Sequence, residues 1–85
     1  MAQVVLKSGL FGDRTIKVNI STKIGVPSRT ATGTGRAVTL IKQASGEVTV
    51  RYDHGKNNIT SQTYDRKTAL QEAAKFIVKY EPAVR

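Results

Sequence analysis

Positively charged side chains are the residues with the clearest chemical meaning in this sequence. The chain of 85 residues has 14 Lys and Arg against 6 Asp and Glu, which gives a formal net charge of +8. A small domain with such a charge favours anionic partners, and a nucleic acid is the first choice among them. The side chains that we expect to contact phosphates are Arg14, Lys17, Asn19, Lys23, Arg29, Arg36 and Arg51.

Residues with catalytic potential are few, and their spacing does not favour an enzyme. His54 is the single histidine, and the sequence has no cysteine that could share a metal ion with it. It lies in an expected turn between Asp53 and Gly55, and a catalytic role would need a nucleophile or a second titrating group held close to it in space, which the sequence does not show. The six acidic residues are scattered over turns and a helix. We therefore expect a protein without enzymatic activity, metal or cofactor.

The glycine-rich segment 32–36 has the composition of a phosphate-binding loop but not its context. Loops that hold phosphate with glycine amides lead into the N-terminus of a helix. Here the next residues alternate as a strand does, and the dinucleotide fingerprint is absent from the sequence. The surrounding segment 22–35 is expected to be a flexible loop with only positive charges. It is either a mobile linker or a loop that contacts a polyanion.

Cysteine content and hydropathy indicate in which cellular compartment the chain is expected. Without cysteine there are no disulfides, which permits an intracellular location. The N-terminus lacks the basic start and long apolar run of a secretory signal. The apolar runs are far shorter than the roughly 20 residues that span a bilayer. We expect a cytoplasmic protein without membrane association.

Residues 66–80 have the most regular pattern in the chain and predict an amphipathic helix. Asp65 is a suitable N-cap, because its carboxylate can accept hydrogen bonds from free amides of the first turn. Pro82 disfavours helical geometry at the residue before it, so the helix should end near Tyr80. Lys75 and Lys79 are expected on its solvent side. The apolar stripe consists of Leu70, Ala73, Ala74, Ile77 and Val78.

The residues before this helix read as strands. Alternation of apolar and polar residues is typical of half-buried strands, and Gly46 suits the left-handed position of a short hairpin loop. One helix cannot bury its own apolar stripe, so the strands must supply the surface that covers it. We predict one α+β domain over residues 1–85: an antiparallel sheet of four or five strands, a β-meander, with the C-terminal helix on one face. The predicted strands are 2–7, 14–21, 36–43, 47–52 and 57–64.

The sheet face opposite the helix is the expected binding surface. Its residues carry hydroxyls, amides and positive charge, which suit contacts with phosphates and little sequence preference. An ordinary solvated sheet face explains the same threonines by their β-propensity alone. Most aromatic residues are expected in the core, so the pattern does not support a stacking platform. The expected members of this face are Thr15, Lys17, Asn19, Thr39, Thr49, Arg51, Thr60, Gln62 and Tyr64.

The sequence leaves several alternatives open. The partner is DNA or RNA, in single- or double-stranded form. The competing hypothesis is a protein-docking or self-assembling module, such as a small subunit or a phage-type inhibitor, that uses the same basic face on an acidic protein. A symmetric homodimer is expected in either case, because the terminal strands of a small sheet leave unpaired edges.

Overall fold

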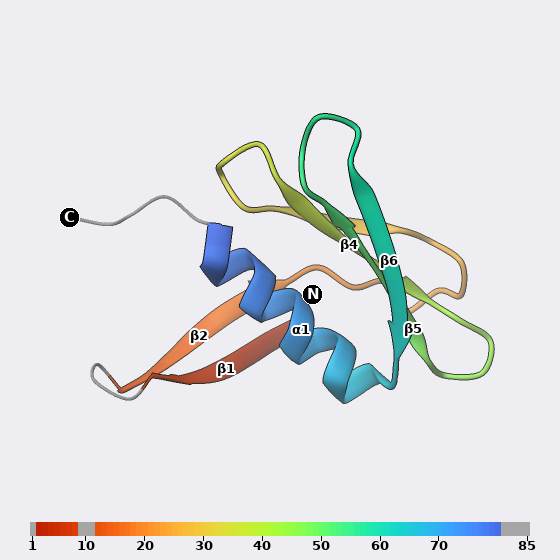
Figure 1. The fold of residues 1–85 in the computed structure, drawn as a ribbon. Coiled ribbons are helices and arrows are strands. Elements are labelled where there is room, and N and C mark those ends of the chain that lie inside the picture. The colour runs from red at the N-terminus through yellow and green to blue at the C-terminus, as the bar shows by residue number, and fades with distance from the viewer. Residues whose placement is uncertain (1, 9–11, 81–85) are drawn as a thin grey trace.

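Two antiparallel sheets and one helix make up the described part of the chain, which is residues 2–8 and 12–80 of a computed structural model (Figure 1). One sheet has the strand order β1-β2, and the other has the order β3-β4-β5-β6. The predicted α+β fold with a C-terminal helix is thereby confirmed. The elements are β1 (Ala2–Ser8), β2 (Gly12–Val18), β3 (Ser28–Ala31), β4 (Ala37–Lys42), β5 (Val48–Asp53), β6 (Ile59–Tyr64) and α1 (Arg66–Tyr80).

The meander β4-β5-β6 follows the predicted pattern closely. Val38, Leu40 and Val50 alternate with more exposed residues and are fully buried. The β4–β5 turn closes with a hydrogen bond from the Gly46 N–H to the Gln43 carbonyl at 3.0 Å. Gly46 has a φ of 93°, the left-handed conformation that glycine adopts without a steric penalty.

The hairpin β1–β2 is separate from the larger sheet, whereas the sequence suggested one continuous sheet. Ala2 pairs with Val18 at one end and Ser8 with Gly12 at the other. The expected turn over 8–13 includes residues 9–11, which lie outside the described residues. After β2, Asn19 joins the two sheets: its backbone N–H donates to Thr30 Oγ1 at 2.9 Å and its Nδ2 donates to the Arg29 carbonyl at 3.0 Å.

Segment 22–35, expected to be an irregular basic loop, contains strand β3. Ser28–Ala31 pairs with β4 from Leu40 to Ala37. The Gly25 N–H also donates to the Lys42 carbonyl at 2.8 Å. The physical reason is that β4 carries fully buried side chains and its backbone groups need partners on both sides. The short SRTA sequence has no apolar alternation, so its own pattern does not reveal the strand.

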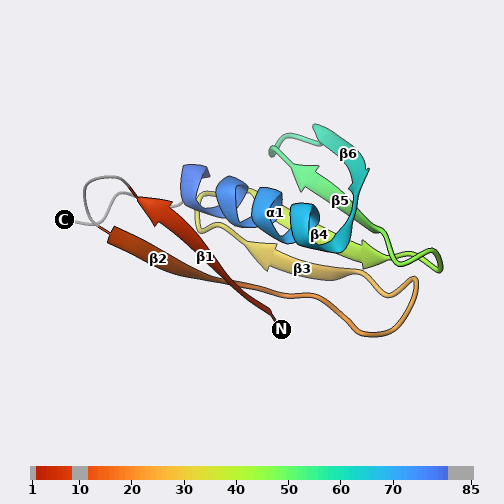
Figure 2. The same ribbon diagram turned by 90° about the horizontal axis from the view of Figure 1, so that it is seen from below.

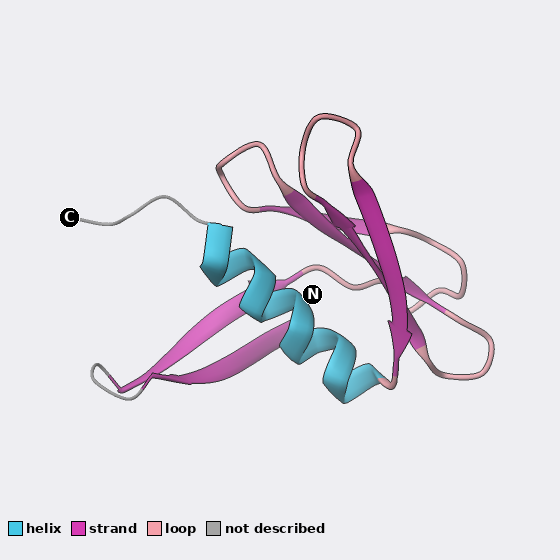
Figure 3. Cartoon of the chain, in the orientation of Figure 1, coloured by secondary structure: helices cyan, strands magenta, loops and turns pink. Residues whose placement is uncertain are grey.

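Helix α1 lies across the inner sides of both sheets (Figures 2 and 3). Its predicted bounds are confirmed, and the N-cap is confirmed by a hydrogen bond from the Thr68 N–H to Asp65 Oδ1 at 3.2 Å. Hydrogen bonding to Thr68 lowers the pKa of Asp65. Leu70 and Val78 of the predicted stripe are only partly buried. The buried helix residues are Ala69, Ala73, Ala74, Phe76 and Ile77.

The core is formed where the helix meets the strands. Alanines on α1 let the helix approach the sheets closely, and aliphatic side chains of the strands fill the space between. Both sheets contribute, so the single helix holds the hairpin and the meander together. The strand residues of this core are Val4, Ile16, Val18, Val38, Leu40, Val48 and Val50.

Candidate functional site

A row of four polar residues crosses the larger sheet on the side away from α1. Directly paired residues of antiparallel strands project to the same face. The register pairs Arg29 with Thr39, Thr39 with Arg51, and Arg51 with Ser61. Arg29, Arg51 and Ser61 are exposed, and Thr39 is half-buried. Since Val38 and Leu40 beside Thr39 are buried in the core, this row faces outward.

A second row of hydroxyl groups lies beside the first. Thr49 pairs with Ile41 and with Thr63, and the Thr49 and Thr63 hydroxyl oxygens are 3.0 Å apart. Gln43 Nε2 donates to Thr49 Oγ1 at 3.0 Å. We call the surface formed by both rows the outer face. Its residues are Arg29, Thr39, Ile41, Thr49, Arg51, Ser61 and Thr63.

The electrostatics of the outer face are positive. Arg29 and Arg51 stand on strands separated by β4, so their Cα atoms are about 10 Å apart. Asp53 is on the same side of β5, where its Oδ1 accepts a hydrogen bond from the Gly55 N–H at 2.9 Å, and its single carboxylate offsets only one of the two guanidinium charges. The two guanidinium groups therefore face solvent with polar neighbours that can also contact phosphate oxygens.

The predicted orientation of the β6 side chains was wrong, because the alternation along the strand is shifted by one residue. Thr60, Gln62 and Tyr64 were expected on the outer face, but they pair with Tyr52, Val50 and Val48. These three positions therefore lie on the α1 side of the sheet. Ser61 and Thr63 occupy the outer face instead. The cause is the 54–58 turn: a shift of one residue in such a connection moves every side chain of the next strand to the opposite face.

The remaining predicted contacts are dispersed. Lys17 is exposed on β2, on the side away from α1, in the smaller sheet. Lys23 is exposed in the connection to β3, and its backbone N–H donates to Ser21 Oγ at 3.1 Å. Asn19 uses its amide to join the two sheets. The backbone of Arg14 pairs with Leu6, and its side chain lies outside the described residues.

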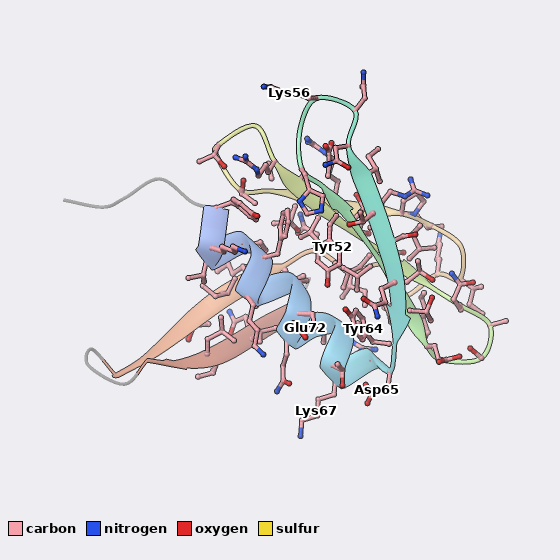
Figure 4. All side chains as sticks on the ribbon, viewed as in Figure 1. Tyr52, Lys56, Tyr64, Asp65, Lys67 and Glu72 are labelled. Atoms are coloured by element: carbon pink, nitrogen blue, oxygen red, sulfur yellow. The ribbon has the colours of Figure 1, made fainter. Side chains whose placement is uncertain are left out.

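Aromatic side chains line a groove on the opposite side of the sheet, between α1 and the β5–β6 pair. The groove has a volume of about 350 Å³. Figure 4 shows Tyr52 and Tyr64 between α1 and β6. Thr60 and Gln62 are exposed although they face the α1 side, so the helix leaves this part of the sheet uncovered. We call it the aromatic groove, and its lining is Tyr52, His54, Tyr64, Glu72, Lys75, Phe76, Lys79 and Tyr80.

The rings of the aromatic groove contact one another in tilted or edge-on geometry. Phe76 lies at the centre, with ring centroids 5.1 Å from Tyr52, 5.5 Å from His54 and 4.8 Å from Tyr80. Such pairs are the favoured arrangements of aromatic rings. The guanidinium of Arg36 lies 4.6 Å from the centre of the Tyr80 ring. Arg36, which was expected to contact phosphates from the basic loop before the third predicted strand, is therefore on the groove side of the sheet.

Hydrogen bonds fix the polar atoms of the aromatic groove. The Tyr52 and Tyr64 hydroxyl oxygens are 3.4 Å apart, and the Tyr64 hydroxyl donates to Gln62 Oε1 at 3.0 Å. Burial and the neighbouring Tyr64 hydroxyl raise the pKa of Tyr52, so this phenol stays neutral. His54 Nε2 lies 2.9 Å from Thr60 Oγ1.

A second hollow adjoins the aromatic groove at His54. It measures about 300 Å³ and lies between the turn before β4 and the turn after β5. Lys56 adopts a left-handed conformation with a φ of 53°, and the Asn58 N–H closes its turn on the Gly55 carbonyl at 3.0 Å. The Thr34 hydroxyl donates a hydrogen bond to the Tyr80 carbonyl, which links the turn before β4 to the C-terminal end of α1. We call this hollow the turn pocket; its lining is Thr34, Gly35, Arg36, His54, Gly55 and Lys56.

Several classes of site find no support in the described part of the chain. Residues 2–8 and 12–80 contain no group of three or more histidine and carboxylate side chains that could hold a metal ion. Within those ranges, α1 is too short and too polar to cross a bilayer. Comparison of the chain with protein-family models, curated protein sequences and solved structures gave no match.

Proposed function

We propose that the protein is a non-enzymatic nucleic-acid-binding domain that contacts the phosphate backbone through its outer face. The observation that carries this proposal is the row Arg29, Thr39, Arg51 and Ser61, which crosses four strands and presents two exposed guanidinium groups. Arginine donates two parallel hydrogen bonds to a phosphate, and threonine and serine hydroxyls add neutral donors.

The chemistry of the outer face favours binding without strong sequence preference. The net charge of +8 supplies long-range attraction to a polyanion. The described outer face is a sheet surface with short hydroxyl side chains and no helix that would enter the major groove and read base edges. Its contacts are therefore with phosphates, and its affinity should fall steeply with salt.

The decisive experiment removes the two arginines and measures the salt dependence of binding. Arg29→Gln with Arg51→Gln should lower the slope of log affinity against log salt by about 1.4 for a single strand or about 1.8 for a duplex. Fluorescence anisotropy with labelled DNA and RNA oligonucleotides, in single- and double-stranded form, measures this slope.

A matched control removes the same charge elsewhere. Arg66 and Lys67 are exposed at the start of α1 and belong neither to the outer face nor to the aromatic groove. Arg66→Gln with Lys67→Gln should change the slope much less. Equal slopes for both double variants would contradict the assignment of the outer face. Absence of any binding at ~0.15 M salt would contradict nucleic-acid binding itself.

A protein partner is the second candidate, and the edge of β6, which pairs only with β5 in the described part of the chain, favours it. β6 is the last strand of its sheet, and every residue from Ile59 to Thr63 is exposed. Such an edge can pair with a strand of another chain through its backbone groups. An acidic protein would then bind with mild salt dependence, and replacements at only a few positions would weaken it.

A further inference from the structure

The aromatic groove exposes rings that a core would normally cover. Tyr52, Tyr64 and Tyr80 are each only half-buried, whereas Phe76 beneath them is 7% exposed. Apolar hollows of about 300 Å³ or more with a few polar groups are the usual form of ligand sites. The sheet and helix that hold these rings are regular elements, so the groove is formed before any ligand arrives.

Positive charge surrounds this apolar surface. Lys75 and Lys79 on α1 are exposed and line the aromatic groove, whereas the sequence predicted them on the solvent side of the helix, away from the open sheet face, with little effect on binding. Arg36 and Lys56 line the adjoining turn pocket. Glu72 is the one acidic residue in the lining of either hollow. Four cations and one carboxylate favour an anionic ligand that also has a flat apolar part.

A nucleotide unit has this combination of properties. Bases stack on tyrosine rings, and this contact tolerates any base because every base has an aromatic face. The two hollows share His54 as a lining residue, so they lie next to each other. A base among the tyrosine rings would place its sugar-phosphate next to Arg36 and Lys56. The Tyr64 hydroxyl and the Glu72 carboxylate are within the lining and can bond to a base edge.

We infer that the aromatic groove binds one unpaired base of a single-stranded nucleic acid, with the adjoining phosphate in the turn pocket. The inference rests on the proposed function and adds a strand preference to it. A base inside a duplex is paired and stacked on both sides, so it cannot enter the groove without the energy of unstacking. The outer face binds phosphates of either form, and the aromatic groove selects the single strand.

Tyrosine fluorescence tests the inference directly. The chain has three tyrosines and no tryptophan, and all three tyrosines line the aromatic groove. The probe is a single-stranded oligomer of about ten thymidines, a length within the range of single-strand sites. We expect this oligomer to quench the tyrosine emission. A duplex of the same length should bind through the outer face and leave the emission nearly unchanged.

An abasic oligomer of the same length separates base contacts from phosphate contacts. It keeps the charge of the thymidine oligomer and lacks the bases. The loss of one stacked base should weaken its binding about 5- to 150-fold. Equal affinity of both oligomers, or anisotropy that reports binding without quenching, would overturn the inference and leave the proposed function intact. No binding of any oligomer or duplex would overturn both.

Variants at the groove rim complete the test. Lys75→Gln with Lys79→Gln changes exposed side chains and should preserve the fold. It should weaken single-strand binding several-fold more than duplex binding. The control Arg66→Gln with Lys67→Gln removes the same charge from the same helix and should weaken both forms equally. A lysine double variant that weakens both forms alike would also overturn the inference. Tyr80→Ala should also lower the fraction of the tyrosine emission that the thymidine oligomer quenches.

Discussion

The replacement of Ile77 by alanine tests the central role of α1 in the fold. Ile77 is 8% exposed and belongs to the core that the helix forms with both sheets. Ile→Ala at such a position removes buried carbon atoms and leaves a cavity, at a cost of about 2–4 kcal/mol in free energy of unfolding. Leu70 shares the apolar stripe but is only partly buried, so Leu70→Ala should cost clearly less. The structure therefore predicts different losses of stability at two positions that the apolar periodicity of the sequence does not distinguish.

Urea denaturation followed by far-ultraviolet circular dichroism measures this ranking. A chain of 85 residues has a total stability of about 4–13 kcal/mol, so the Ile77 variant should show a much lower midpoint. Lys67→Ala, at an exposed position of the same helix, serves as the control and should lie within about 0.5 kcal/mol of the parent. A loss below about 0.5 kcal/mol for Ile77→Ala, or a larger loss for Leu70→Ala, would refute the packing described above.

Two further predictions concern acid stability and self-association. The folded pKa of Asp65 lies below its ordinary value of 3.8, so its contribution to stability is present above that pH and is lost as the pH falls through the folded pKa. Asp65→Asn keeps a capping oxygen without the titration, so urea midpoints measured toward pH 2 should decline less steeply for the variant. We also expect a dimer in sedimentation at high micromolar concentration, and Ile59→Lys on the exposed β6 edge should favour the monomer. A parent protein that sediments as a monomer would contradict the second prediction.

The apolar periodicity of the sequence was enough to predict the elements that bury only one face. The stripe on α1 predicted the helix, because apolar residues at three- and four-residue steps must meet the core, and Asp65 and Pro82 predicted its bounds. Gly46 predicted the β4–β5 turn, because glycine adopts the left-handed φ of this position without a steric penalty. The outer-face positions of Thr39, Thr49 and Arg51 followed directly, because that hairpin fixes the register of both strands.

The remaining features depend on tertiary structure that local patterns do not encode. β3 forms because β4 needs a partner, not because SRTA prefers a strand. The face of β6 depends on the turn before it, where Lys56 and Asn57 adopt positive φ without being glycine. The aromatic groove depends on how much of the sheet α1 covers. Composition shows three tyrosines but cannot show that each remains half-buried.

Strand β6 connects the two proposed surfaces, and this position constrains how they can be used together. Ser61 and Thr63 belong to the outer face, while Tyr64 lines the aromatic groove on the other side of the same strand. A single strand that contacts Arg51 and also inserts a base beside Tyr64 has a short path over the edge of β6, which pairs with β5 alone among the described strands. A second copy paired along β6 would occupy that edge. We therefore expect binding of a single strand across both surfaces to compete with dimerisation through β6: by linkage, a single-stranded oligomer would favour the monomer to the same extent that dimerisation weakens its binding.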